Sequence, residues 1–141
     1  MHKRAAIIAE ARRWKDTPFH HQGRALGVGV DCAGVIAGIA HNLGISDFDR
    51  LDYAPIPHKR ELEQVLDAQM VPLKIPDPRQ VTEPAAVLLM QFATEPQHVA
   101  ILTESDTIIH AYSRVGRCVE HRFAPVWRGR VIKAYRFPGV R

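Results

Sequence analysis

The chain has 141 residues, of which 46% are hydrophobic and 24% are charged, and a formal net charge of +4 at pH 7. This length suits one domain, which we expect over residues 1–141, and the composition excludes a disordered or fibrous protein. The basic residues are scattered and form no tail, so we expect no nucleic-acid partner. No stretch is long and apolar enough for a signal peptide or a membrane span, which predicts synthesis in the cytoplasm and no membrane partner.

The spacing of apolar residues predicts three helices in the first half of the chain. They are expected near residues 7–14, 32–43 and 59–70. The middle helix has the clearest ends, because Asp31 is a favourable N-cap and Gly44 a favourable stop. Pro72 should end the third helix. Residues 45–58 and the proline-rich residues 72–84 are expected to be connections.

In the second half, short runs rich in β-branched and aromatic residues alternate with turn residues, which is typical of strands. The runs are "AAVLLMQF", "HVAILT", "TIIHAY", "RCVEHRF" and "RVIKAYRF". Helices followed by strands predict an α+β fold in which the helices pack on one antiparallel sheet of about five strands.

Cys32, one of two cysteines, lies where a glycine-rich loop meets the middle helix. The first turn of a helix presents unpaired N–H groups and a partial positive charge, which favour the nucleophilic thiolate. The backbone N–H of Cys32 would also help to hold an oxyanion. The plain alternative is a small apolar residue buried on a core helix.

A cysteine nucleophile also needs a histidine to exchange protons with it and a third group to orient that histidine. His98 opens one expected strand and His110 lies in the next. A two-residue turn at Ser105 and Asp106 would place these histidines on opposite faces of the sheet, whereas an odd loop or a bulge would place them together. The sequence leaves both arrangements open.

Two blocks of the sequence resemble the NlpC-type (NlpC/p60) cysteine peptidases, which are papain-like hydrolases of bacterial cell walls. These blocks are "TPFHHQGRALGVGVDCAG" and "QHVAILTESDTIIHAY". The resemblance implies a papain-like fold, with Cys32 as nucleophile, His98 as general base and acid, and His110 as its orienting residue. It implies hydrolysis of a peptidoglycan stem-peptide amide, such as that between D-glutamate and diaminopimelate, with no cofactor. Asp31 would form a wall of the substrate cleft.

The sequence departs from the family pattern close to this cleft. Phe19 replaces a tyrosine, Ala33 a serine and Ala100 a glycine, which changes the expected substrate subsite more than the chemistry. Phe19 and His21 are expected to line the cleft. Arg24 would either meet a substrate carboxylate or remain a solvated loop residue.

The segments "TPFHHQG" and "WRGRVIKAYRFPG" resemble those of small family members encoded among the tail genes of phages and phage-like gene transfer agents. The resemblance implies tail or baseplate partners and action in the periplasm of a target cell. A structural or adaptor component of a tail tip, with little or no hydrolysis, is the alternative.

A zinc site is a further possibility, with His20, His21, Cys118 and His121 as ligands. No C-x-x-C pair is present, and strand alternation sends Cys118 and His121 to opposite faces. We therefore expect no metal, and we expect Cys118 to be a plain sheet residue.

Overall fold

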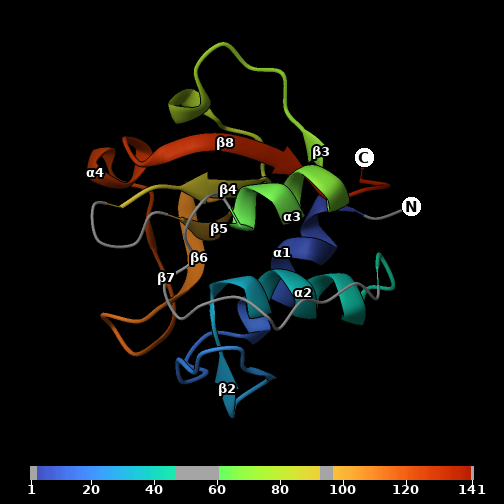
Figure 1. The fold of residues 1–141 in the computed structure, drawn as a ribbon, viewed down its shortest axis with the longest axis vertical. Coiled ribbons are helices and arrows are strands. Elements are labelled where there is room, and N and C mark those ends of the chain that lie inside the picture. The colour runs from blue at the N-terminus through green and yellow to red at the C-terminus, as the bar shows by residue number, and fades with distance from the viewer. Residues whose placement is uncertain (1–2, 47–60, 93–96, 141) are drawn as a thin grey trace.

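The computed structural model describes residues 3–46, 61–92 and 97–140 (Figure 1). The helices are α1 (Arg4–Arg13), α2 (Cys32–Asn42), α3 (Glu61–Gln69) and α4 (Pro125–Arg128), and Pro78–Gln80 form a 3-10 turn. The strands are β1 (Arg24–Ala25), β2 (Gly29–Val30), β3 (Val71–Pro72), β4 (Val87–Met90), β5 (His98–Leu102), β6 (Thr107–Tyr112), β7 (Arg117–Arg122) and β8 (Val131–Arg136).

One antiparallel sheet of six strands, in the order β3-β8-β4-β5-β6-β7, forms the centre of the fold. The five predicted strands are confirmed as β4 to β8, and the α+β class is confirmed with them. The sixth strand, β3, lies where the sequence predicts the end of the third helix and the start of a connection. It pairs with β8 through Val71 and Pro72 at the edge of the sheet, where a proline removes no central ladder bond.

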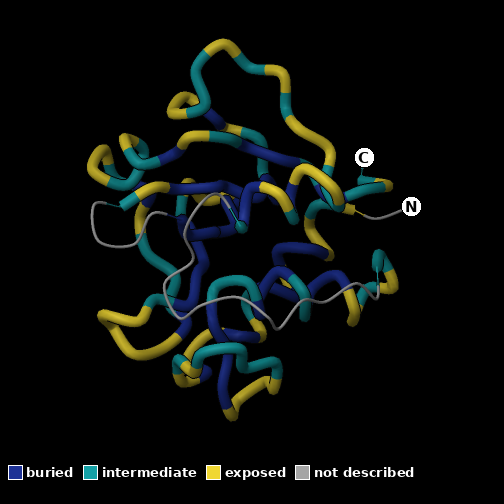
Figure 2. Tube along the Cα trace, viewed as in Figure 1, coloured by how far each residue is buried: buried dark blue, intermediate teal, exposed yellow. Residues whose placement is uncertain are grey.

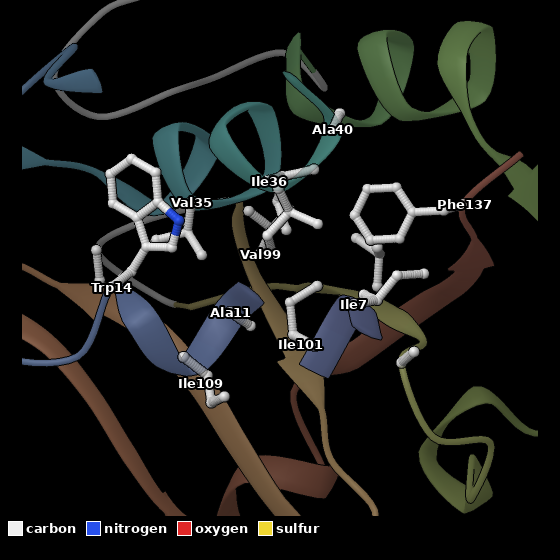
Figure 3. Close-up of a cluster of buried hydrophobic side chains, with 14 of the residues drawn as sticks. Ile7, Ala11, Trp14, Val35, Ile36, Ala40, Val99, Ile101, Ile109 and Phe137 are labelled. Atoms are coloured by element: carbon white, nitrogen blue, oxygen red, sulfur yellow. The ribbon is translucent and has the colours of Figure 1, made fainter. Parts of the chain in front are cut away.

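The first hydrophobic core lies between one face of the sheet and the helices α1 and α2 (Figure 3). Both helices direct their apolar stripe at this face, as their spacing predicted. In Figure 3, Ile7 and Ala11 of α1 and Val35 and Ile36 of α2 flank side chains of β5 and β6. Figure 2 shows the same layer as a buried band through α2 and the central strands.

Gly38, in the middle of α2, lets the two helices approach each other. A Cβ at this position would collide with the indole ring of Trp14, which lies just after α1. Trp14 is only 2% exposed. The glycine therefore costs some helix propensity but makes room for the largest side chain between the two helices.

The other face of the sheet has its own core, built from alternate residues of the same strands. Leu88, Ala100 and Ile108 belong to this second cluster, whereas their neighbours Leu89, Val99 and Ile109 belong to the first. The second cluster is covered by side chains of the segment 73–81 and by Trp127 of α4.

The third helix is fastened to the sheet by polar side chains. The side-chain oxygen of Gln97 accepts hydrogen bonds from the backbone N–H groups of Leu62 at 2.7 Å and Glu63 at 3.3 Å. At the other end, the hydroxyl of Tyr135 donates to Asp67 at 2.6 Å. The predicted helix is confirmed over Glu61–Gln69, while its expected first residues 59–60 and most of the connection 45–58 lie outside the described residues.

None of the helices in the described ranges has the length and hydropathy that a membrane crossing requires.

Candidate active site

Cys32 is the first residue of α2 and is half-buried at the edge of the first core. The N–H groups of the first helical turn have no acceptor within the helix, so the positive end of the helix dipole is at this position. Cys118, in contrast, is buried in β7, and burial raises the pKa of its thiol to about 12, with a further contribution from Asp16. Burial therefore keeps Cys118 protonated, whereas Cys32 lies at a helix start, a position that favours a thiolate.

Asp31 caps α2 as predicted and also holds the loop before it. Its Oδ1 accepts from the N–H of Gly34 at 2.8 Å, and its Oδ2 accepts from the N–H of Gln22 at 2.9 Å. Nη1 of Arg24 donates to Oδ1 at 3.0 Å. Asp31 is only 3% exposed, so these contacts give its carboxylate a structural role in placing Cys32.

Residues 17–19, which precede the cysteine loop, form backbone hydrogen bonds at the edge strand β7. The N–H of Cys118 donates to the carbonyl of Thr17, and the N–H of Phe19 donates to the carbonyl of Gly116, both at 2.8 Å. Phe19 also forms a parallel bridge with Val30, just before Cys32. These backbone bonds tie the cysteine loop to the same sheet that carries the candidate histidines.

The hairpin between β5 and β6 settles which face the histidines share. Ile101 lies opposite Ile109 and Leu102 opposite Ile108, and the N–H of Thr103 bonds to the carbonyl of Thr107. The loop is therefore residues 104–106, an odd number, with Asp106 in the left-handed region at φ 57°. Three-residue hairpin loops end in such a residue, and aspartate tolerates this conformation. His98 and His110 consequently lie on one face.

The two imidazoles are in direct contact. Nε2 of His98 lies 2.7 Å from Nδ1 of His110, within hydrogen-bond distance. His98 is 3% exposed and His110 is 1% exposed. This contact uses Nε2 of His98 and leaves Nδ1 on the other side of the imidazole ring. The arrangement leaves this nitrogen for proton exchange with another group.

A third histidine, which sequence reasoning considered only as a zinc ligand, extends the pair. Nε2 of His121 in β7 lies 2.8 Å from Nε2 of His110, and Nδ1 of His121 lies 3.0 Å from the backbone carbonyl oxygen of Arg122. The predicted alternation holds, since Cys118 packs in the first core and His121 lies on the other face. The register that pairs Ile108 with His121 creates this contact, and residue spacing alone did not reveal it.

Burial keeps the central imidazoles uncharged. It lowers the pKa of His98 to about 3, with a smaller effect from the charge of Arg130. It lowers the pKa of His110 to about 2, with smaller effects from His98, His121 and Arg130. Both side chains are therefore neutral near pH 7, which works against a resting thiolate–imidazolium ion pair at His98.

Aromatic rings enclose the histidines. Tyr112 stacks on His110 with ring centroids 5.3 Å apart, and Trp127 meets the same ring edge-on at 4.9 Å. Phe92 lies 5.3 Å from the ring of His98. The guanidinium of Arg130 lies between Phe92 and Trp127, 4.5 and 4.6 Å from their ring centres. These contacts fix the orientation of the imidazole rings and exclude water from their faces.

The cysteine and the histidines approach from different sides of the sheet. Helix α2 packs on β5 and β6, where Val99 belongs to the core beneath it. Because side chains alternate, His98 lies on the opposite face from Val99. His98 is the first residue of β5, and Cys32 is the first residue of α2.

A hollow lies between α2 and α3, and neither Cys32 nor His98 is among the described residues that line it. Its lining includes Ala33, the neighbour of Cys32, and Val99, the neighbour of His98, together with Arg24 and the apolar side of α3. The hollow is therefore mainly apolar, and Arg24 and Glu61 are the charged residues in its lining.

The structure distributes the remaining predicted substrate-binding residues as follows. Phe19 is half-buried against the first core, and His21 is half-buried in the loop before β1. Arg24 pairs with Asp31, so any contact with a substrate carboxylate would be made by this pair. No three His, Cys, Asp or Glu side chains within the described ranges are arranged to hold a metal ion.

No protein-family model matches the sequence, and no curated protein is detectably related to it. Solved structures do match the fold. An NlpC/p60 family protein from Bacillus cereus has a TM-score of 0.68 and 17% identity over 95% of this chain and 40% of that chain. A Staphylococcus aureus protein described as similar to a lipoprotein of the NLP/P60 family has a TM-score of 0.63 and 18% identity, over 95% and 41%.

The NlpC/p60 domain of the peptidoglycan hydrolase SagA has a TM-score of 0.61 and 19% identity, over 94% of this chain and 97% of that domain. The chain thus spans about two-fifths of the first two proteins and nearly all of this isolated domain. The chain therefore has the papain-like α+β fold of NlpC/p60 domains.

Proposed function

We propose that the chain is a cysteine peptidase that hydrolyses an amide bond in peptidoglycan stem peptides. The observation that carries this proposal is the hydrogen-bonded pair of His98 and His110 on the strands against which α2, with Cys32 at its first position, is packed. The likeness in fold to the NlpC/p60 domain of a peptidoglycan hydrolase supports the same reading.

In the first step, Nδ1 of His98 takes the proton of the Cys32 thiol while the sulfur attacks the carbonyl carbon of the amide. The neutral state of His98 makes it a base that acts during attack. Catalytic hydrogen bonds often tighten only when the substrate binds, so we propose that the proton passes from Cys32 to His98 in the complex with substrate. The backbone N–H of Cys32, at the start of α2, helps to hold the oxyanion.

In the second step, the C–N bond breaks and the proton on His98 passes to the departing amine, which leaves a thioester on Cys32. His98 then removes a proton from a water molecule, and the resulting hydroxide attacks the thioester. The acyl group leaves as a carboxylic acid and the thiol is regenerated. His110 keeps the ring of His98 in place through both steps.

For the substrate we propose the D-glutamyl–diaminopimelate amide. Such a stem peptide has short apolar side chains and free carboxylates. The apolar hollow beside Ala33 and Val99 suits the former, and Arg24 in its lining suits a carboxylate. Phe19 and His21 precede the cysteine loop and are proposed to border the same subsite.

The test is digestion of purified peptidoglycan by the wild-type chain, Cys32→Ala and Cys118→Ala, with mass spectrometry of the released muropeptides. We expect wild type and Cys118→Ala to release fragments cut at one stem-peptide amide and Cys32→Ala to release none. Hydrolysis by Cys32→Ala overturns the nucleophile assignment. No release by the folded wild-type chain favours the adaptor role at a tail tip.

We also propose that the chain acts as a component of a phage-like tail that opens the wall from the periplasmic side. The support is the resemblance of "TPFHHQG" and "WRGRVIKAYRFPG" to small tail-encoded family members. Mass spectrometry of particles from the producing strain tests it. Recovery of the chain at fixed stoichiometry with tail or baseplate proteins is expected, and its absence from particles contradicts the proposal.

A further inference from the structure

We propose that His121 is a positioning residue that, together with the backbone carbonyl of Arg122, fixes the tautomers of all three histidines and leaves the lone pair on Nδ1 of His98. The inference deepens the proposed function, because it rests on His98 being the general base. It concerns a residue outside the pair of His98 and His110.

The geometry is a continuous row of three contacts. Nε2 of His98 lies 2.7 Å from Nδ1 of His110. Nε2 of His110 lies 2.8 Å from Nε2 of His121. Nδ1 of His121 lies 3.0 Å from the carbonyl oxygen of Arg122. Each imidazole thus uses the nitrogens that face its neighbours, and only Nδ1 of His98 is left over at one end.

The carbonyl at the other end decides the direction of every bond. A carbonyl oxygen only accepts hydrogen bonds, so Nδ1 of His121 must carry a hydrogen. In a neutral imidazole the other nitrogen is then bare, and Nε2 of His121 accepts from Nε2–H of His110. By the same rule Nδ1 of His110 is bare and accepts from Nε2–H of His98. Nδ1 of His98 is therefore the bare nitrogen.

The surroundings favour the neutral state of His98 and His110, which this argument needs. His98 and His110 are almost fully buried, and burial opposes a charge on either ring. Trp127 contacts His110 and His121 at centroid distances of 4.9 Å. Arg130 is packed against Trp127 and forms no ion pair within the described ranges. Its positive charge also disfavours protonated rings nearby.

Through this row, His121 also affects the activation barrier of the reaction. When Nδ1 of His98 takes a proton, the ring becomes positive and its Nε2–H bond to His110 strengthens. His110 can meet that demand because its own Nε2–H is held by His121. Aligned hydrogen bonds of this kind polarise one another in a buried site. Without an acceptor at position 121, the tautomer of His110 is no longer fixed and a fraction of His98 carries its hydrogen on Nδ1.

The first readout is the protonation state of each ring nitrogen, measured by long-range ¹H–¹⁵N NMR on the whole chain without substrate. We expect hydrogen on Nε2 of His98, on Nε2 of His110 and on Nδ1 of His121. Hydrogen on Nε2 of a neutral His121, or on Nδ1 of His98, overturns the inference. This measurement does not depend on hydrolysis, so it distinguishes a wrong tautomer pattern from a wrong proposed function.

The second readout compares His121→Leu, which removes the acceptor, with His121→Gln, whose amide oxygen can accept from His110. We expect His121→Leu to lower kcat about tenfold or more with little change in KM, since an imidazole in the wrong tautomer is an ineffective base. His121→Gln should recover most of kcat. His41→Leu, an exposed histidine near the end of α2, is the matched control and should behave as wild type. Wild-type kcat in a folded His121→Leu, or equal losses in both His121 variants, overturns the inference.

Discussion

Nε2 of His98 lies 2.7 Å from Nδ1 of His110, although the two residues are 12 positions apart and belong to different strands. The contact exists because the hairpin between them has an odd loop, which brings both side chains to one face. Burial makes the contact costly to lose, since a buried N–H without an acceptor destabilises a fold by about 1–3 kcal/mol. The pair therefore serves both the stability of the sheet and the orientation of the proposed base.

Replacing His110 should separate orientation from packing. His110→Phe keeps a ring against Tyr112 and Trp127 but removes the acceptor for His98. We expect kcat to fall at least about 100-fold, because His98 loses its fixed tautomer and orientation. His110→Gln retains an acceptor and should lose less. Steady-state kinetics on a soluble stem peptide measures the effect. If His110→Phe and His110→Gln have the same kcat as each other, the orienting role of His110 is contradicted.

The two cysteines should differ in their reaction with iodoacetamide. Cys32 is half-buried at a helix start, whereas the thiol of Cys118 is buried and its pKa is raised to about 12. We expect native protein at pH 8 to be modified at Cys32 alone, and Cys118 to react only after denaturation. Peptide mapping by mass spectrometry gives the answer. Rapid labelling of Cys118 in the native chain would show that β7 is not packed as described.

Acid should destabilise the fold through the same histidines. In the folded state the pKa values of His98 and His110 lie at about 3 and about 2, below the ordinary value of 6.5. The unfolded chain therefore binds more protons below pH 6.5, so stability falls as the pH falls through that value. Between pH 7.5 and 5 each histidine contributes a loss of about 2 kcal/mol.

Urea unfolding at pH values from 7.5 to 5 measures this loss. Carboxylates with lowered pKa values, such as Glu83 and Glu120, lose their contribution mainly below pH 4.5, so they add little to the change measured above pH 5. His110→Gln removes one titrating group and should flatten the pH dependence by about half. If the free energy of unfolding of His110→Gln depends on pH as steeply as that of wild type, His110 is not held neutral in the fold.

Much of the fold could be predicted from the sequence, because local patterns determine much of it. The strands β4 to β8 are runs of β-branched and aromatic residues, and α2 has a good cap and a good stop at its ends. The short elements were missed for an equally local reason. A two-residue strand such as β3, or a four-residue helix such as α4, is too short to show a period. Their positions follow from pairing with β8 and from packing under the second face.

The site could be predicted only in part. Cys32, His98 and His110 stand out by residue type and neighbours, but the shared face of the two histidines depends on one residue, Asp106, adopting a left-handed conformation. The contact of His121 with His110 depends on the register of a second hairpin. Registers are set by the whole sheet, so a list of residue types does not contain them.

Asp31 should matter more for placing Cys32 than for binding substrate. Asp31→Asn keeps an oxygen that can accept from Gly34 but loses the ion pair with Arg24, whereas Asp31→Ala loses both. We expect Asp31→Ala to lower the free energy of unfolding by about 1–3 kcal/mol and Asp31→Asn by less. Chemical denaturation measures both, with Asp77→Asn, at the exposed 3-10 turn, as the control. Equal stability of wild type and Asp31→Ala would refute the capping role.

Gly38 gives the last prediction, because it tests how closely α1 and α2 approach. In an exposed helix, replacing glycine by alanine stabilises by up to about 1 kcal/mol. Here the new Cβ collides with the indole of Trp14, so we expect Gly38→Ala to lower the thermal midpoint instead. Trp14→Leu alone leaves a cavity and should also destabilise, by about 3–5 kcal/mol at most. The double variant should be more stable than the sum of the two changes predicts, since the smaller side chain vacates the space that the Cβ needs. Strict additivity in calorimetry would show that Gly38 and the indole of Trp14 are not in close contact.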